Sequence, residues 1–138
     1  MDLEERRQRA LRYIDGIARS DLPESLFAPE FSGWSGMSGD IPGPELRKRA
    51  LMIKELFRDG LAFEIFDMVA EGDIVAIRAS SHGILDDGTD YRNDYHFQFQ
   101  FDQQDRILKV REFMNVKVAA ELIRPAMQRR MQARAASE

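Results

Sequence analysis

The chain has 138 residues, of which 43% are hydrophobic, so it can bury one ordinary core and has little room for a second domain. Its 20 basic and 24 acidic side chains give a formal net charge of -4, which argues against nucleic acid and anionic membranes as partners. The lack of cysteine excludes disulfides, thiolate metal sites and a cysteine nucleophile.

The N-terminal segment gives a prediction about location. Met1 to Arg9 is highly charged and does not resemble a secretory leader. No apolar run approaches the ~20 residues that a bilayer-spanning helix needs. We therefore expect a cytoplasmic protein.

The first 58 residues predict helices with one short strand between them. Asp2 to Arg19 has apolar residues at spacings of three and four, typical of an amphipathic helix. A short second helix is expected to end near Phe27. Phe31 to Gly39 is rich in glycine and serine and predicts a short strand and a loop. Another helix should begin at Pro44 and run to about Arg58. The solvated side of the first helix is assigned to Arg6, Arg7, Arg9 and Arg12.

The next 54 residues predict four antiparallel strands joined by tight turns. The expected strands are Leu61–Ala70, Ile74–Leu85, Tyr91–Asp102 and Ile107–Met114. In the third of them aromatic and polar residues alternate over twelve positions, which predicts one aromatic face and one polar face. Asn115 is a candidate N-cap for a short helix, Val116–Ile123, and a polar, basic tail follows Pro125.

These elements predict a single α+β domain over residues 1–138. Its helices occupy about 2–58, its sheet about 61–114, and a C-terminal helix and tail 115–138. Because the sheet must bury its aromatic face against the helices, we expect a curved antiparallel sheet wrapped by N-terminal helices into a cone open at one end.

The segment YRNDYHFQFQFDQQDRILKVREFMN, from Tyr91 to Asn115, resembles the signature of SnoaL-like and ketosteroid-isomerase-like proteins. AEGDIVAIRASSHG resembles the hairpin that precedes it. The resemblance covers nearly the whole chain and implies the cone fold of the nuclear transport factor 2-like superfamily. That fold serves isomerases, polyketide cyclases, dehydratases, epoxide hydrolases and non-catalytic binding modules, so the function must be argued from the site.

Two enzymes of the superfamily differ from this chain at their catalytic positions. In limonene epoxide hydrolase an arginine bridges two carboxylates; Arg78 and Glu112 match the arginine and one carboxylate, but Ser80 stands where the other is needed. Ketosteroid isomerase has a general-base aspartate just after its first strand, and this chain has no carboxylate between Phe31 and Gly39. Phe97 occupies the position of that enzyme's oxyanion-hole acid. Ser80 argues against epoxide hydrolysis, and the other two differences argue against steroid isomerisation.

Glu112 is the leading candidate for catalysis. By alternation it shares a strand face with Leu108, Val110 and Met114. In an apolar pocket its pKa would rise and it could act as a general acid or base. The alternative is a structural glutamate held by an arginine or by backbone donors.

Arg78 and His82 share one strand face and are the other predicted catalytic residues. Arg78 is expected to orient Glu112, or else to form an ordinary ion pair. Its opposite neighbour is Asp67 if the preceding turn has two residues, and Phe66 if it has three. His82 is expected near the pocket mouth, with a structural role as the alternative.

A further set of residues is expected to line the pocket and bind the substrate. Asn93 would donate to a ligand or bond the backbone at a bulge. The expected walls are Tyr91, Tyr95, Phe97, Trp34, Met37, Phe57 and Met114. His82 and His96 lie on opposite faces, and the sequence has no phosphate loop, nucleophile elbow or metal-ligand cluster, so neither metal nor cofactor is expected.

Three functions remain open at this point. The first is a cofactor-independent isomerase, dehydratase, cyclase or hydrolase that acts on a hydrophobic small molecule through Glu112. The second is a binding module for a small ligand, without chemistry. The third is an assembly protein whose outer sheet face forms a homodimer, which the resemblance implies in any case.

Overall fold

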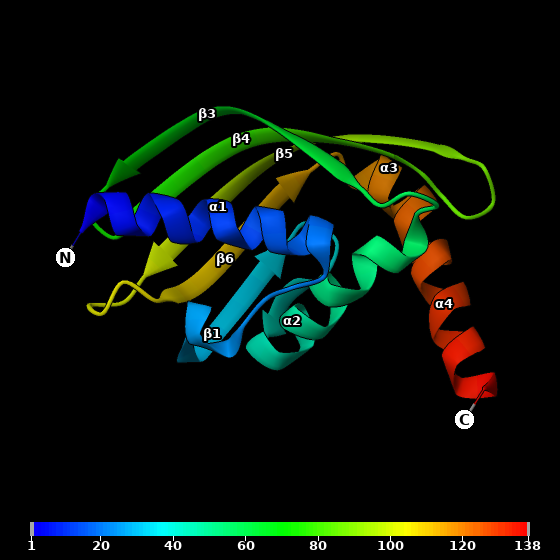
Figure 1. Cartoon of the computed structure of the whole chain (residues 1–138), viewed down its shortest axis with the longest axis horizontal. Coiled ribbons are helices and arrows are strands. Elements are labelled where there is room, and N and C mark those ends of the chain that lie inside the picture. Colours follow the sequence, from blue (N-terminus) through cyan, green and yellow to red (C-terminus); the bar gives the residue numbers. More distant parts are fainter. Residues whose placement is uncertain (1, 138) are drawn as a thin grey trace.

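The structure is a computed structural model, and it describes residues 2–137. One curved sheet forms a layer over the helices, with α1 crossing beneath it (Figure 1). The helical elements are α1 (Leu3–Arg19), η1 (Glu24–Leu26), α2 (Gly43–Met52), η2 (Ile53–Leu56), α3 (Val116–Val118), η3 (Ala119–Ile123) and α4 (Arg124–Ala136). The strands are β1 (Phe27–Ser35), β2 (Gly39–Pro42), β3 (Ala62–Glu71), β4 (Ile74–Ile84), β5 (Asp90–Phe101) and β6 (Ile107–Met114).

The strand order is β2-β1-β6-β5-β4-β3, and all neighbours are antiparallel except β1 and β6, which are parallel. The expected α+β cone is confirmed, with two differences. The loop expected before residue 40 forms a hairpin, β1–β2, so the sheet has six strands rather than five. The first strand, β1, lies beside the last one, β6, and these two strands run parallel.

α1 forms where the apolar stripe predicted it. Asp2 caps its N-terminus by accepting hydrogen bonds from two backbone N–H groups, and Ser20 ends it in a left-handed conformation. Ala10, Tyr13, Ile14 and Ile17 are buried against the inner face of the sheet. α1 therefore covers the sheet and places Tyr13 over its centre.

Arg6 was expected on the solvated side of α1, but this residue is only 2% exposed. Its guanidinium donates to the Asp105 carboxylate and to the carbonyls of Gly72 and Asp102. It also lies over the Phe101 ring. This contact, which we call the Arg6 clasp, joins α1 to the β3–β4 and β5–β6 turns.

The inner face of the sheet is apolar and mostly buried. The alternation expected for β5 is confirmed, because Tyr91, Phe97, Phe99 and Phe101 are buried. On β4 the buried positions include Val75, Ile77, Ala79 and Ser81. Arg78 and His82 alternate with these residues and so belong to the outer face.

The C-terminal segment forms a helix, where the sequence suggested a polar tail. Residues 116–136 run on as α3, the π-helical turn η3 and α4, and Asn115 caps the start through its side chain, as expected. Ala126 is buried in a second core cluster with Leu56, Phe57, Leu61, Leu85 and Tyr91. Figure 1 shows α4 at the opposite end of the molecule from the N-terminus.

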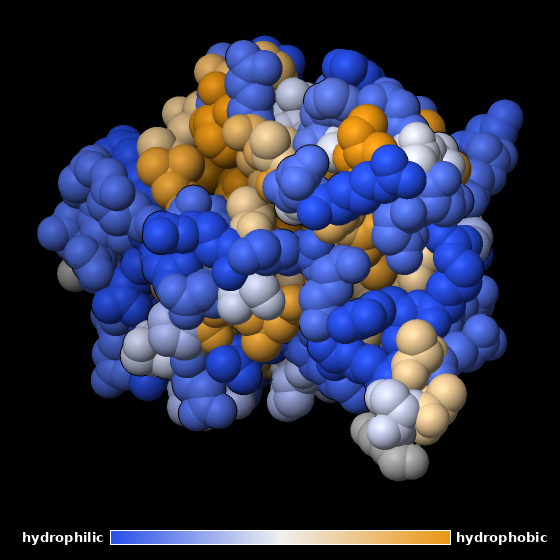
Figure 2. Space-filling model, turned by 45° about the vertical axis from the view of Figure 1, so that its right-hand side comes forward, coloured by the Kyte–Doolittle hydropathy of each residue, from blue (hydrophilic) through white to orange (hydrophobic). Residues whose placement is uncertain are grey.

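No helix of residues 2–137 is long and apolar enough to cross a bilayer. The surface in Figure 2 is largely hydrophilic, and hydrophobic side chains gather in a few patches.

Candidate functional site

A cavity of about 380 Å³ lies between the inner face of the sheet and the helices. The sheet contributes its floor, and α1, α2, η3 and α4 contribute its walls. Six of the predicted lining residues border it: Tyr91, Tyr95, Phe97, Trp34, Met37 and Met114. Glu112, the candidate acid or base, borders it too. Trp34 also packs on the outer face, where its ring is 5.0 Å from that of Phe113.

Glu112 reaches the cavity from β6 because it pairs with Phe97 on β5 and so shares the inner face. Its Oε1 atom accepts a hydrogen bond of 3.2 Å from the Tyr13 hydroxyl. No Lys, Arg or His in residues 2–137 forms an ion pair with it. Burial raises the pKa of Glu112 to about 7, and the hydrogen bond from Tyr13 opposes part of that rise.

Arg78 does not orient Glu112, so the predicted pairing of these two residues is wrong. Arg78 lies on the outer face, where its Nε donates to Asp67 Oδ2 at 2.7 Å and its guanidinium stacks over Phe66. The register pairs Arg78 with Asp67, so of the two neighbours considered from the sequence, Asp67 is the correct one. A bulge at Phe66 turns that ring to the outside as well.

His82 is also on the outer face and is not a neighbour of Glu112. Its Nε2 lies 2.7 Å from Asp90 Oδ1, and both side chains are about half exposed. A catalytic pair of His82 and Glu112 is therefore excluded by the strand alternation. The periodicity had placed Arg78 and His82 on one face correctly, but it could not say which face was inner.

Asn93 is buried, and all its polar atoms have partners. Its Nδ2 donates to the Tyr91 hydroxyl (3.0 Å) and to the Asn115 carbonyl (3.1 Å), while its Oδ1 accepts from the backbone N–H groups of Asp94 and Asn115. Asn93 thus ties the end of β6 to β5, which agrees with the backbone-binding alternative. Phe57 does not border the cavity either; it packs 5.7 Å from the Tyr91 ring, in the second core cluster.

Tyr91 and Tyr95 form a hydroxyl network beside Glu112. The two phenol oxygens are 2.8 Å apart, and the Ser81 hydroxyl donates to Tyr95 at 3.1 Å. Burial raises the pKa of both tyrosines, and the charge of Glu112 raises it further, so both stay protonated at neutral pH.

Within residues 2–137, the hydroxyl network leaves one tyrosine O–H group free to donate a hydrogen bond to a ligand. Asn93 donates to Tyr91, and Ser81 donates to Tyr95. Only one of the two tyrosine O–H groups can donate in the bond between them. Whichever one does, the other O–H has no acceptor among residues 2–137, and both tyrosines border the cavity.

Tyr13 is the functional residue that sequence reasoning missed. It is fully buried, bonds to Glu112 and borders the cavity. The apolar stripe of the first helix runs through its position, and a tyrosine hydroxyl in such a stripe needs a buried partner. That signal could have identified it, although not its partner 99 residues away.

The arrangement defines a class of protein: an α+β cone of the nuclear transport factor 2-like type that encloses an apolar cavity with one carboxyl group in it. The family model for the SnoaL-like domain matches residues 10–110. The chain belongs to the SnoaL-like family. None of the proteins with curated functions that were compared with it matches significantly.

Solved structures share the fold at low sequence identity. A putative hydroxylase, AclR, from Streptomyces galilaeus is 17% identical with a TM-score of 0.72, over 88% of this chain and 86% of that one. A putative SnoaL-like polyketide cyclase from a Jannaschia species is 16% identical with a TM-score of 0.73, over 87% and 92%. PrhC from Penicillium brasilianum is 17% identical with a TM-score of 0.75, over 93% and 91%.

Proposed function

We propose that this chain is an enzyme that acts without a cofactor on a hydrophobic small molecule, with Glu112 as its general acid and base. The observation that carries the proposal is a carboxyl group that borders an apolar cavity, has no cationic partner among residues 2–137 and has a pKa of about 7. At neutral pH such a group is present in both protonation states, which suits it to accept a proton and return it.

Besides a base, proton abstraction next to a carbonyl needs a hydrogen-bond donor for the carbonyl oxygen. The tyrosine O–H that has no acceptor among residues 2–137 supplies this donor. When Glu112 removes a proton from a carbon next to a carbonyl, the electron pair moves to the carbonyl oxygen. A hydrogen bond from Tyr91 or Tyr95 stabilises that developing charge. The proton then returns at another position, or the enolate attacks within the molecule or expels a leaving group.

This arrangement favours isomerisation, cyclisation or dehydration over hydrolysis. Hydrolysis of the epoxide type would need Arg78 beside Glu112, and Arg78 lies on the outer face with Asp67. The fold shared with a putative polyketide cyclase supports the same group of reactions.

Exchange of acidic C–H protons tests the proposed base directly. β-Tetralone in D₂O is incubated with the protein, and loss of its α-proton signals is followed by NMR. We expect Glu112→Gln to lower the exchange rate at least ~100-fold, because it removes the base. The wild-type rate should rise with pH and level off above about 7. The matched control is Glu64→Gln, since Glu64 is an exposed carboxylate on β3.

Equal exchange by wild type and Glu112→Gln would rule out Glu112 as the base. If β-tetralone still bound to both proteins, a non-catalytic ligand-binding module would be the better interpretation.

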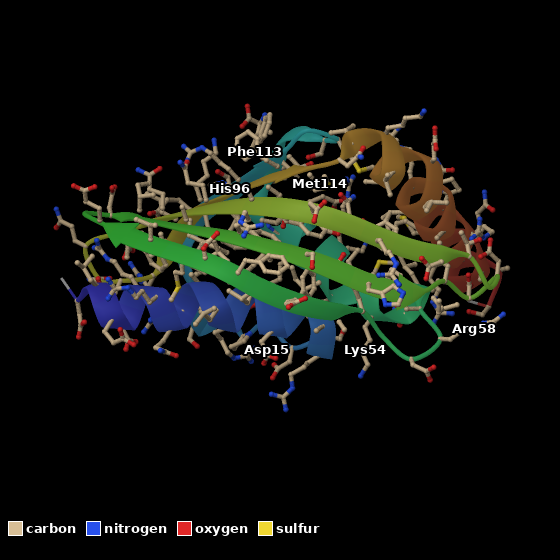
Figure 3. The ribbon with its side chains drawn as sticks, turned by 90° about the horizontal axis from the view of Figure 1, so that it is seen from above. Asp15, Lys54, Arg58, His96, Phe113 and Met114 are labelled. Atoms are coloured by element: carbon tan, nitrogen blue, oxygen red, sulfur yellow. The ribbon has the colours of Figure 1, made fainter. Side chains whose placement is uncertain are left out.

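We also propose that two copies of the chain associate through the outer sheet face. Val69 on β3 is 65% exposed and Phe113 on β6 is 47% exposed, and Phe66 is a further exposed apolar side chain on this face. Figure 3 looks onto this face, where His96 and Phe113 lie next to each other on paired strands. Such a surface would be buried by a symmetric partner.

The mass in solution tests the proposed dimer. We expect sedimentation to give twice the chain mass, and Phe113→Asp to shift it toward the single-chain mass because a charge would be buried at the interface. Val116→Asp, at an exposed apolar position on α3, is the matched control. A wild-type protein that sediments as a single chain at micromolar concentration contradicts the proposal.

A further inference from the structure

The cavity has a closed floor and an open rim that differ in chemistry. Tyr13, Tyr91 and Phe97 border it at positions that are at most 1% exposed. The exposed residues that border the cavity come from the helices and from the β1–β2 turn: Ser38, Arg49, Arg124, Gln128 and Met131. These five form what we call the rim.

The rim carries two positive charges and no negative one. Among the residues of 2–137 that border the cavity, Arg49 and Arg124 are the only charged ones apart from Glu112. The Arg124 side chain makes no hydrogen bond or ion pair with any residue of the described range 2–137, and only its backbone N–H donates, to the Ala119 carbonyl. Arg49 has one partner, Glu45, one turn earlier on α2, and both of these side chains are about half exposed. Exposed pairs of this kind contribute little, so Arg49 can change partners easily.

We propose that the rim is an anion subsite, so that the substrate is an elongated apolar molecule with an anionic group at one end. Its apolar body fills the cavity, its anionic group lies at Arg124 and Arg49, and its opposite end meets Glu112. A carboxylate suits the subsite because the planar guanidinium can donate two parallel hydrogen bonds to it. The inference rests on the proposed function, whose site it extends.

Charge elsewhere in the molecule does not explain these two arginines. On α4, Arg130 and Arg134 bind Glu55, and Arg129 lies near Asp86 and Asp87. Those three arginines have acidic partners and do not border the cavity. Arg124 is on the same segment and borders the cavity instead. In a chain of net charge -4, a positive rim is a local feature that attracts anions to this opening.

A pair of fluorescent probes separates the anion subsite from the apolar cavity. Anilinonaphthalene sulfonate carries an anionic group, and phenylnaphthylamine is its neutral analogue. We expect the wild type to bind the sulfonate more tightly at low salt, with the difference shrinking as salt is added. Arg124→Gln should weaken sulfonate binding about fivefold and leave phenylnaphthylamine within about twofold, as expected for one exposed charge contact.

Three controls keep the outcomes distinct. Arg129→Gln removes an equal charge outside the cavity and should change neither affinity. Met127→Trp fills the cavity and should abolish binding of both probes, which excludes the outer sheet face as their site. Glu112→Gln should retain the preference for the sulfonate, so failure of the catalytic proposal cannot be mistaken for failure of this one.

Equal affinity of the wild type for the two probes would overturn the anion subsite while leaving the proposed chemistry intact. Equal effects of Arg124→Gln and Arg129→Gln would also overturn it, since the protein's general charge would then explain the preference. Failure of both probes to bind would reject the cavity as a ligand site.

Discussion

Glu112 illustrates how one residue connects the fold to the proposed chemistry. Strand alternation places it on the inner face, Tyr13 is its hydrogen-bond partner, and the apolar walls raise its pKa to about 7. An ordinary glutamate has a pKa near 4.5. The folded protein therefore holds this proton more tightly than the unfolded chain does, and that difference links the site to stability.

The first prediction concerns the pH dependence of that stability. Because the folded pKa is raised, the Glu112 contribution is neutral below about 4.5 and becomes increasingly destabilising up to about 7. Glu112→Gln should therefore stabilise the protein at pH 8 by up to about 3 kcal/mol and have a much smaller effect at pH 4. Urea unfolding of both proteins at the two pH values measures this. An equal effect at pH 4 and pH 8 would mean that the carboxyl group has an ordinary pKa.

At the scale of elements, the sequence predicted the helices and strands better than it predicted which residues they bring into contact. The alternation in β5 and the stripe in α1 are local patterns, and both elements formed where these patterns indicated. The inner face of β4 follows from its pairing with β5, which sets Ile77 opposite Phe97 and Arg78 opposite His96, and a one-residue change in register would exchange the faces. Pairing between strands is a long-range property, so the alternation grouped Arg78 and His82 on one face correctly but did not show that this face is the outer one.

The Arg6 clasp is a second feature whose partners the sequence pattern could not predict. Arg6 appeared in the sequence as one of several solvated arginines, because nothing local indicates partners that lie 66 and 99 residues away. In the folded protein Arg6 is a buried charged residue among residues 2–137. Its N–H groups donate hydrogen bonds to acceptors in two turns at once. Its burial depends on long-range contacts that no periodicity encodes.

The second prediction is that the Arg6 clasp stabilises the fold strongly. Arg6→Met keeps the length and apolar stem but leaves the Asp105 carboxylate and the Gly72 carbonyl without this donor, and the Asp102 carbonyl keeps only the Asp105 backbone N–H. We expect a loss of about 3 kcal/mol in the free energy of unfolding, since breaking a buried charged pair is costly. Arg7→Met is the matched control, because Arg7 forms only an exposed pair with Glu4. Similar urea midpoints for the two variants would show that the clasp contributes little.

At the scale of the whole molecule, the C-terminal helix and the sheet enclose the cavity between them. α4 is held by the buried Ala126 and by ion pairs from Glu55 to Arg130 and Arg134. These contacts link the segment after the sheet to η2, which precedes it. A cavity wall thus depends on charges at the molecular surface.

The third prediction tests that dependence. Glu55→Lys replaces an attraction for Arg130 and Arg134 with repulsion, so α4 should open more often while the sheet stays closed. Hydrogen exchange should become about tenfold faster in residues 124–136 and remain unchanged in β4 and β5. Lys54→Glu, at the adjacent position, is the control. Faster exchange throughout the chain would indicate a global loss of stability, and unchanged exchange in α4 would show that the ion pairs do not hold it.

The π-helical turn η3 has a consequence for how this family can diversify. One residue more or fewer within Ala119–Ile123 would change the phase of everything that follows it by roughly 100°, the rotation of one helical residue. Met127, Gln128 and Met131 would turn away from the cavity together, while every strand kept its register. A single-codon insertion or deletion at this turn would thus exchange one whole wall of the cavity in one generation, without any substitution in the sheet that carries Glu112.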